Sequence, residues 1–437
     1  MADSLTHKRV LGIAIPIVLS NATVPILGAV DTGVIGQLGA AAPIGAVGVG
    51  AIILSSFYWV FGFLRMGTTG LTAQAIGAKD ASETAALLSR SLMIGIGAGV
   101  AIILLQIPLF WAAFKLAPAS SEVETLAKTY LQIRVFSAPA AIALYGITGW
   151  LIAHERTRAV LVLQFWMNGL NIVLDLLFVL TFHWGVEGVA IATFLAEWTG
   201  LGLGLWLARF GFMGGLWRNW VQIFDRARLR RMAVVNGDIM IRSVLLQAAF
   251  TSFLFLGARF GDTTLAANQV LLQFMYITAY AMDGFAYAAE ALIGQALGAH
   301  NRQVFRRSVY LTSFWGVVSV VFMTVAFAVW GGWIIDVMAT APDVRTEARQ
   351  YLPWMVLAPI TGVACWMLDG IFIGATRSGD MRNMMLISVL IYVASLWVLL
   401  GPFGNHGLWA SMIMFFIVRG VTLGWKYPAL EASVEQV

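Results

Sequence analysis

Charge is scarce in this chain of 437 residues: 11% of its residues are Asp, Glu, Lys or Arg, whereas 60% are hydrophobic. A soluble domain carries about 25% charged residues. Apolar stretches of about 20 residues, the length that crosses a bilayer as a helix, recur from one end of the chain to the other. The composition therefore excludes an ordinary soluble protein and indicates a polytopic helical membrane protein.

Cysteine and histidine are too few to build a disulfide framework or a metal centre. Cys365 stands alone, and the five histidines fall in predicted loops or at predicted span ends, without metal-ligand spacing. The sequence also lacks an HExxH motif, a Walker loop and a GxSxG motif. We therefore expect no enzyme activity, no cofactor and no ATP-driven pumping by this chain alone.

The hydrophobic pattern predicts an all-α protein with twelve transmembrane helices. The predicted spans are residues 10–35, 44–75, 86–114, 124–150, 158–182, 187–210, 231–258, 264–296, 306–334, 347–373, 382–401 and 406–425.

The basic residues predict the orientation of these spans. If the N-terminus is cytoplasmic, 19 of the 27 Lys and Arg lie inside and six lie outside, while Arg65 and Arg242 lie within spans. Because cytoplasmic loops are enriched in basic residues, we predict a multi-pass inner-membrane protein with both termini in the cytoplasm. The six outer basic residues are Lys115, Lys128, Arg134, Arg259, Arg345 and Arg349.

The two halves of the chain repeat each other at an offset of 221 residues. Gln74-Ala-Ile-Gly-Ala78 returns as Gln295-Ala-Leu-Gly-Ala299, and Gly149 returns as Gly370. Six spans in each half give the repeats the same orientation, an arrangement typical of transporters that work by alternating access. We predict an N-lobe of residues 1–213, a cytoplasmic interfacial linker of residues 214–231 and a C-lobe of residues 232–437, around a central cleft.

The first span holds a single carboxylate, Asp31, together with Pro16 and Pro25. A charged side chain in hydrocarbon costs a few kcal/mol or more, so an intramembrane acid indicates a functional site. Each proline removes a backbone hydrogen bond and weakens the helix before Asp31, which allows it to bend. Two alternatives stay open: Asp31 reaches the outer headgroups, or the prolines only set a fixed kink.

Span five offers further polar groups at a similar depth. Asn171 and Asp175 are four residues apart and share one helix face, and Thr193 of span six can add a hydroxyl. We predict that these three residues form an ion-coupling or proton-coupling site with Asp31. The alternative is that they only join helices by hydrogen bonds.

The repeat favours a functional role for these four residues. At the offset of 221, the second half has none of the acids or amides in their places, whereas a purely structural requirement should recur in both halves. The counterparts of Asp31, Asn171, Asp175 and Thr193 are Ser252, Tyr392, Leu396 and Met414.

A second set of charged residues lies mainly in the C-terminal half. Asp238 and Arg242 are four residues apart and can pair on one face of span seven, and Asp283 and Glu290 share a stripe of span eight. Arg65 of span two can balance one of these acids. Most such residues form structural ion pairs, and we regard this set as candidates for substrate or gating groups.

Several phrases of the sequence resemble the multidrug and toxic compound extrusion (MATE) transporters, and most closely their DinF branch. The resemblance covers all parts of the chain. The phrases are IPIVLSNATVPILGAVDTGVIGQLG, FLRMGTTGLTAQAIGA, LNIVLDLLF, NGDIMIRSVLLQ, DGFAYAAEALIGQALGA and LDGIFIGATRSGD.

This resemblance implies two six-helix lobes around a V-shaped cleft, and export of amphipathic or cationic organic compounds by a monomer. It implies that H⁺, or in some members Na⁺, drives export. In the DinF branch the ion-linked carboxylate matches Asp31, with Asn171, Asp175 and Thr193 around it and the bending-helix proline at Pro16. No cofactor or nucleic-acid partner is expected.

We therefore predict a multidrug efflux transporter that works by H⁺ antiport, with Asp31 as the proton-linked carboxylate. One alternative is a Na⁺-coupled antiporter that uses the same oxygen ligands. Another is a lipid-linked flippase of related architecture, which should have a large basic cavity, whereas the intramembrane positions hold two arginines, Arg65 and Arg242, against several acids.

Overall fold

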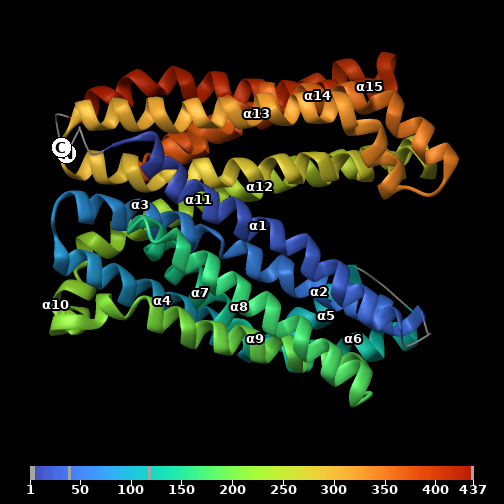
Figure 1. The fold of residues 1–437 in the computed structure, drawn as a ribbon, viewed down its shortest axis with the longest axis horizontal. Coiled ribbons are helices and arrows are strands. Elements are labelled where there is room, and N and C mark those ends of the chain that lie inside the picture. Colours follow the sequence, from blue (N-terminus) through green and yellow to red (C-terminus); the bar gives the residue numbers. More distant parts are fainter. Residues whose placement is uncertain (1–4, 38–40, 117–119, 435–437) are drawn as a thin grey trace. The chain divides into compact units, whose positions relative to one another are not determined.

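The computed structural model describes residues 5–37, 41–116 and 120–434, except for the side chains of Ala29, Asp31 and Thr32. Within these ranges every regular element is a helix (Figure 1). The elements of the first half are α1 (His7–Gly36), α2 (Ala41–Val60), α3 (Phe63–Gly77), α4 (Ala81–Leu104), α5 (Gln106–Leu116), α6 (Ser121–Arg134), η2 (Val135–Ser137), α7 (Ala138–Ala153), α8 (Thr157–Asp175), η3 (Leu176–Thr181) and α9 (Gly185–Leu207). Then follow η4 (Arg209–Arg218), α10 (Trp220–Ile223), α11 (Arg226–Gly257), η5 (Ala258–Phe260), α12 (Asp262–Gly298), α13 (Arg302–Met338), α14 (Pro342–Gly374) and α15 (Ser378–Ser433).

The helices account for the twelve predicted spans. Ten helical stretches in the described part of the chain are long and apolar enough to cross a membrane. One of them, α15, is 56 residues long and breaks at Gly404, so it supplies two spans. The twelfth span is α12, which at 37 residues is long enough to cross a membrane. The prediction of an all-α, twelve-helix membrane protein is therefore confirmed.

Span three differs in detail from its predicted range of residues 86–114. The chain leaves the helix at Leu105, so that α4 ends at Leu104 and the separate helix α5 follows. The apolar sequence runs through this break, and for that reason hydropathy alone could not locate it.

The described chain divides into two compact units. The first unit contains Met1–Val18, Ala73–Lys79 and Arg231–Val437, and the second contains Leu19–Thr72 and Asp80–Arg230. Helix α1 therefore passes from one unit to the other after Val18, and α3 does so after Thr72. The boundaries of the two predicted lobes remain a prediction.

The repeat in the sequence is also a repeat of backbone geometry. Residues in the left-handed backbone region are rare outside glycine, yet this structure has three pairs of left-handed residues separated by 221 positions. They are Lys79 and His300, Glu155 and Thr376, and His183 and Gly404, all with φ between 51° and 59°. Positive φ angles thus recur at one offset, and in the pairs Lys79/His300 and Glu155/Thr376 the turn hydrogen bonds recur with them, which indicates that both halves share a backbone fold.

Helix crossings recur at the same offset. A Cβ atom on Gly149 would lie 2.4 Å from the carbonyl oxygen of Arg65, and a Cβ atom on Gly370 would lie 2.6 Å from that of Ala286. These positions correspond at the offset of 221, so α7 crosses α3 as α14 crosses α12. Small residues at such crossings let helix backbones approach closely, and this explains why both glycines are retained.

The predicted linker is anchored to the start of α4. Arg90 donates from Nε to the carbonyl oxygen of Ile223 at 2.8 Å and pairs with Glu83 at 2.7 Å. Glu83 also pairs with Arg228 at 2.5 Å. One carboxylate thus joins a buried arginine of α4 to the first turn of α11, and the linker is fixed at the end of the second unit.

Candidate ion-coupling site

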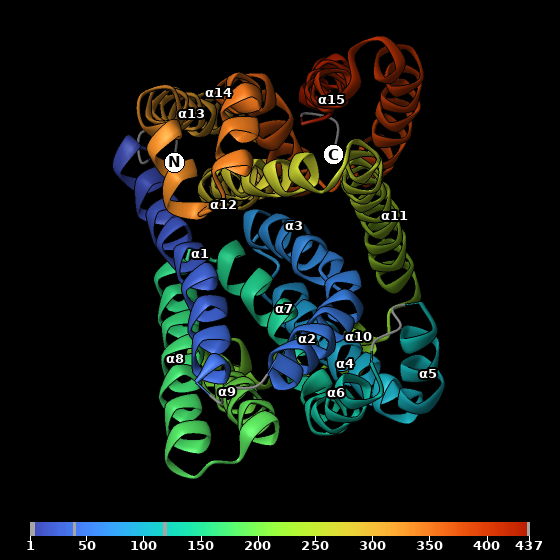
Figure 2. The same cartoon turned by 90° about the vertical axis from the view of Figure 1, so that its right-hand side faces the viewer.

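One face of α8 is polar although the helix lies within the apolar second unit. Asn168, Asn171 and Asp175 follow one another at spacings of three and four residues, which places them on one side of the helix. All three are buried, and Asp175 has no exposed surface. This face is covered in part by α9, which packs along α8 (Figure 2).

The regular α-helix ends at Asp175, and the chain continues as the π-helical turns of η3. π-Helical turns are rare and are found mainly at functional sites. The carboxylate therefore lies at a change of helical geometry within the span. This change could not be predicted from the sequence, because Leu176–Thr181 is uniformly apolar except for its last residue.

Asn171 joins the other two predicted residues of this site. Its amide lies 3.0 Å from the Oγ1 atom of Thr193. When the amide nitrogen is turned toward Asp175, it donates to Oδ2 at 3.3 Å while the amide oxygen accepts from Thr193. The structure thus brings Asn171, Asp175 and Thr193 together in one hydrogen-bonded group.

Asn168, on the same face of α8, contacts α1, and the sequence analysis missed this contact. Its Nδ2 atom donates to the Oγ1 atom of Thr23 at 2.6 Å, and its Oδ1 atom accepts from Gln164 at 3.0 Å. The signal was present, because Asn168 lies three residues before Asn171 and hence on the same helix face. Helix α1 is therefore joined to the polar face of α8 by a direct side-chain contact.

Asp31 belongs to α1, but its side chain lies outside the described residues. Its level along the helix still follows from the Thr23–Asn168 contact. Spans one and five run in the same direction. At 1.5 Å per residue, Asp31 lies about 12 Å beyond Thr23, and Asp175 lies about 10 Å beyond Asn168. The two acidic residues are therefore placed at nearly the same depth.

The second half supplies an independent indication of which residue neighbours Asp31. Ser252 and Tyr392 hold the positions that correspond to Asp31 and Asn171. Their hydroxyl groups lie 3.2 Å apart. Because the halves share a backbone fold, this contact predicts that Asp31 lies beside Asn171.

Pro16 and Pro25 both lie within the continuous helix α1, Pro16 buried and Pro25 exposed. The second unit begins at Leu19, three residues after Pro16. A proline in a helix interior removes one backbone hydrogen bond. The weakest part of α1 thus lies close to the point where the helix passes between units.

The predicted pairing of Asp238 with Arg242 is wrong. Asp238 pairs with Arg382 at 2.6 Å and accepts a hydrogen bond from Ser378 at 2.9 Å. Arg242 instead pairs with Asp369 of α14. Helix spacing allowed the pair within α11, but the neighbouring helices α14 and α15 offer each residue a partner. These interactions hold both side chains in place within the first unit, and a role for Asp238 or Arg242 as a substrate or gating group remains a prediction.

Asp369 is shared by two buried guanidinium groups. Arg419 of α15 contacts the same Oδ2 atom as Arg242, at 2.6 Å. All three side chains are buried. Charge burial is costly unless the charges are paired, so this cluster ties α11, α14 and α15 to one another.

The structure places the remaining candidates, Asp283, Glu290 and Arg65, on α12 and α3. Asp283 is half-buried and Glu290 is buried in α12, where a Cβ atom on Gly374 would lie 2.5 Å from the Glu290 carbonyl oxygen. Arg65 is buried in α3 of the other unit. That Arg65 balances one of these acids therefore remains a prediction.

One buried ion pair was overlooked. Arg134, counted above with the outer basic residues, pairs with Glu197 of α9 at 2.6 Å and donates to Ser137 at 2.5 Å. Both charged residues fall within predicted spans. Because both charged residues lie inside apolar stretches, the sequence could have indicated that they pair.

The repeated motif contacts its own copy. A Cβ atom on Gly77 would lie 2.1 Å from the Gln295 carbonyl oxygen, and one on Gly298 would lie 2.0 Å from the Gln74 carbonyl oxygen. All four residues belong to the first unit. We refer to this reciprocal backbone contact of α3 and α12 as the glycine crossing.

The side chain of Gln74 fastens the glycine crossing to α14. Its Nε2 atom donates to the carbonyl oxygen of Gly374 at 3.1 Å and to the hydroxyl of Thr376 at 3.0 Å. Arg231 donates to its Oε1 atom at 2.6 Å. Residues of the second half of the chain therefore form hydrogen bonds with both the nitrogen and the oxygen of the Gln74 amide, which belongs to the first half.

The chain matches known proteins along nearly its whole length. The MatE family model matches residues 16–177 and 239–398. DNA damage-inducible protein F of Escherichia coli (strain K12) is 40% identical, over 96% of this chain and 92% of that protein. A probable multidrug resistance protein NorM of Rhodopseudomonas palustris is 25% identical, over 92% of this chain and 87% of that protein.

Solved structures share the fold at lower sequence identity. The MATE transporter VcmN of Vibrio cholerae, in its bent form, matches with a TM-score of 0.87 and 21% identity. The match covers 98% of each chain.

Proposed function

The chain belongs to the MatE family, and from this premise we propose that it is a secondary active exporter of amphipathic or cationic organic compounds, driven by H⁺ antiport through alternating access. The resemblance to the DinF branch is confirmed by the 40% identity to the Escherichia coli protein. The chain is a multi-pass membrane protein with a transport role. The coupling ion, the exported compounds and the cytoplasmic position of both termini are parts of the proposal.

The contact between Ser252 and Tyr392 is the observation that carries the proposed proton site. These residues occupy the repeat positions of Asp31 and Asn171, and their hydroxyl groups lie 3.2 Å apart. The first half has a carboxylate and an amide in their places. Asp31 would then complete a group with Asn171, Asp175 and Thr193, in which two carboxylates lie at one depth.

Such a group can link proton binding to substrate release. Burial of a carboxylate favours its neutral form, and a second nearby carboxylate does the same. A bound organic cation favours the ionised form. Proton and cation therefore compete for one negative site, and this competition couples their movements in opposite directions.

Alternating access also needs contacts that form in one conformation and separate in another. The glycine crossing and the Gln74 side chain join a segment of α3 to α12 and α14. We propose that these contacts form in one conformation of the transport cycle and separate when the cytoplasmic side opens.

The experiment is drug efflux from proteoliposomes with an imposed pH gradient and no sodium. We expect Asp31→Asn to abolish gradient-driven efflux and Asp175→Asn to reduce it strongly. Glu187→Gln is the matched control, because this acid of α9 is exposed in the same unit. Undiminished coupled transport by Asp31→Asn would contradict the proton assignment.

Sodium coupling is the nearest alternative, because Asn171, Asp175 and Thr193 present oxygen atoms of the kind that hard cations bind. A second set of proteoliposomes with a sodium gradient at equal pH distinguishes the two ions. Efflux driven by sodium alone, and lost in Asp31→Asn, would replace H⁺ by Na⁺. Movement of a lipid-linked substrate without drug efflux would instead support a flippase.

A further inference from the structure

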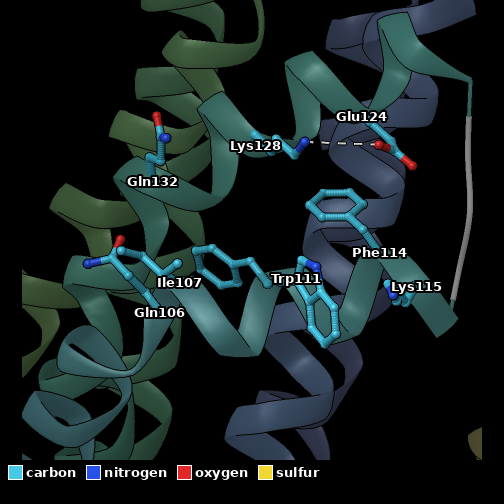
Figure 3. Close-up of a pocket in the computed structure, with 9 residues that line it drawn as sticks. Gln106, Ile107, Trp111, Phe114, Lys115, Glu124, Lys128 and Gln132 are labelled. Atoms are coloured by element: carbon cyan, nitrogen blue, oxygen red, sulfur yellow. Dashed lines mark ion pairs between the residues drawn. The ribbon is translucent and has the colours of Figure 1, made fainter.

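An open groove of about 420 Å³ lies between α5 and α6 in the second unit (Figure 3). The side chains of Ile107, Trp111 and Phe114 form one wall, and Phe110 adds to it. Ile107 and Trp111 are 80% and 63% exposed. The groove is thus largely apolar and accessible from outside the protein.

Two ammonium groups lie over the aromatic rings of this wall. The Nζ atom of Lys115 is 4.3 Å from the centre of the Trp111 ring, and that of Lys128 is 5.4 Å from the centre of the Phe114 ring. Glu124 lies 4.0 Å from Lys128, the outer limit of an ion pair, and the Lys128 side chain is 56% exposed. With one carboxylate for two lysines, the groove carries a net positive charge.

These two lysines differ from most other basic residues predicted on the outer side. Arg134 is paired with Glu197 inside the protein. Arg345 and Arg349 both pair with Asp336, the latter at 2.5 Å. Basic residues are few on the outer side of membrane proteins. Two that converge on one aromatic wall therefore require a reason.

The groove lies at the level of the lipid headgroups. Helix α4 has 24 residues. It measures about 36 Å at 1.5 Å per residue, which is more than the roughly 30 Å of a bilayer's hydrocarbon core. Helix α5 follows directly, so Trp111 and Lys115 reach the interface that is predicted to face outward. Tryptophan and lysine both anchor helices at this depth.

We propose that the groove between α5 and α6 is a binding site for an anionic phospholipid of the outer leaflet. The lipid phosphate lies between Lys115 and Lys128, and an acyl chain lies along Ile107, Trp111 and Phe114. The volume falls in the range of about 300–1,000 Å³ that ligand sites occupy. An exported organic cation does not suit this groove, because both ammonium groups would repel it.

The test measures lipid binding to the purified full-length protein in detergent. Native mass spectrometry counts retained lipids during titration with phosphatidylglycerol or zwitterionic phosphatidylcholine, and inorganic phosphate is tested by the shift in melting temperature. The variant is Lys115→Gln with Lys128→Gln. The matched control is Lys8→Gln with Lys426→Gln, which removes the same charge from the opposite, cytoplasmic side.

The wild type should retain phosphatidylglycerol in preference to phosphatidylcholine, and the control should behave like the wild type. Each lysine near an anionic lipid surface contributes about 1 kcal/mol, so the double variant should bind phosphatidylglycerol roughly thirtyfold more weakly. Replacing both lysines by arginine should preserve binding, and Trp111→Ala should weaken it.

Equal affinity for both lipids, or unchanged binding by the Lys→Gln pair, would overturn the proposal. Stabilisation by inorganic phosphate that matches that of phosphatidylglycerol would also overturn it, because the site would then bind the free anion rather than a lipid. Every variant changes side chains outside the ion-coupling group, and all of these except the half-buried Lys426 of the control are exposed. Retained drug efflux by these variants confirms that they are folded.

Discussion

Replacement of Gly298 by alanine should shift the protein away from the conformation described here. The added Cβ atom would lie 2.0 Å from the carbonyl oxygen of Gln74. Ordinary contact begins at 3.4 Å, so α3 and α12 would have to separate by about 1.4 Å. Gly77→Ala has the same consequence on the other side, at 2.1 Å from Gln295.

The size of the effect follows from the cost of overpacking. Forcing an extra carbon into a packed contact costs about 1–3 kcal/mol. The glycine crossing involves backbone atoms on both helices, and no flexible side chain can move to make room. If the crossing exists in only one conformation of the cycle, the equilibrium should shift by roughly five- to 150-fold toward the other.

The assay is a distance measurement between two spin labels at Lys79 and His300. Both residues are exposed and lie two positions beyond the crossing glycines. The chain has one native cysteine, the buried Cys365, so Cys365→Ala clears the background for labelling. The wild type should give a short distance, and each Gly→Ala variant should add a population at longer distance.

Gly237→Ala is the matched control, because a Cβ atom at that position of α11 meets nothing within 4 Å. It should leave the distance distribution of the wild type unchanged. If Gly77→Ala and Gly298→Ala also leave it unchanged while the proteins remain folded, the glycine crossing does not distinguish two conformations. The proposed role in alternating access would then be refuted.

Two further predictions concern stability. Asp369→Asn should lower the free energy of unfolding by about 3–5 kcal/mol, because it leaves Arg242 and Arg419 buried without a counter-charge. The control is Asp380→Asn, which breaks a pair with Arg377 near the surface and should lower the free energy of unfolding by less than about 1 kcal/mol. Equal losses of unfolding free energy for the two variants, measured by denaturant unfolding, would contradict this reasoning. Burial lowers the pKa of His154, just beyond the end of α7, and the neighbouring charge of Arg156 lowers this pKa further. The hydrogen bond that its Nδ1 atom donates to the Trp150 carbonyl oxygen acts in the opposite direction. As pH falls, the unfolded chain therefore binds a proton at this histidine before the folded chain does. The stability that a neutral His154 contributes is complete above the ordinary histidine pKa and is lost as pH falls below it. The melting temperature should therefore fall less between pH 7.5 and pH 5.5 in His154→Gln than in the wild type, and an identical fall would refute the assignment.

Periodicity and composition were sufficient to predict the spans and the repeat. Long apolar stretches define membrane helices because a bilayer imposes a fixed length on them. The offset of 221 residues was read from Gln74 and Gln295 and recurs in the left-handed residues Lys79 and His300. The break at Leu105 could not be predicted in the same way, because a bend between two apolar helices leaves the hydropathy unchanged.

Side-chain partners were harder to predict than helices. The spacing of Asp238 and Arg242 suggested a pair within one helix, but each found a partner on another helix. Spacing along the sequence describes one helix face and carries no information about which face packs against it. Asn171 and Asp175 are close together, as their spacing predicted, because both residues lie on the same helix, where spacing does determine proximity.

Helix α1 belongs to both units, so a bend within this helix moves one of its ends relative to the other. Its first part is held at Gly284, where a Cβ atom would lie 2.6 Å from the carbonyl oxygen of Ala14, and its later part is held by Asn168 through Thr23. Asp31 lies 15 residues beyond Pro16, about 22 Å at 1.5 Å per residue. A kink of about 20° at this proline would swing the acidic residue by roughly 8 Å relative to the Ala14 end. A small change of helix angle at Pro16 thus produces a displacement of Asp31 that is larger than the length of a hydrogen bond.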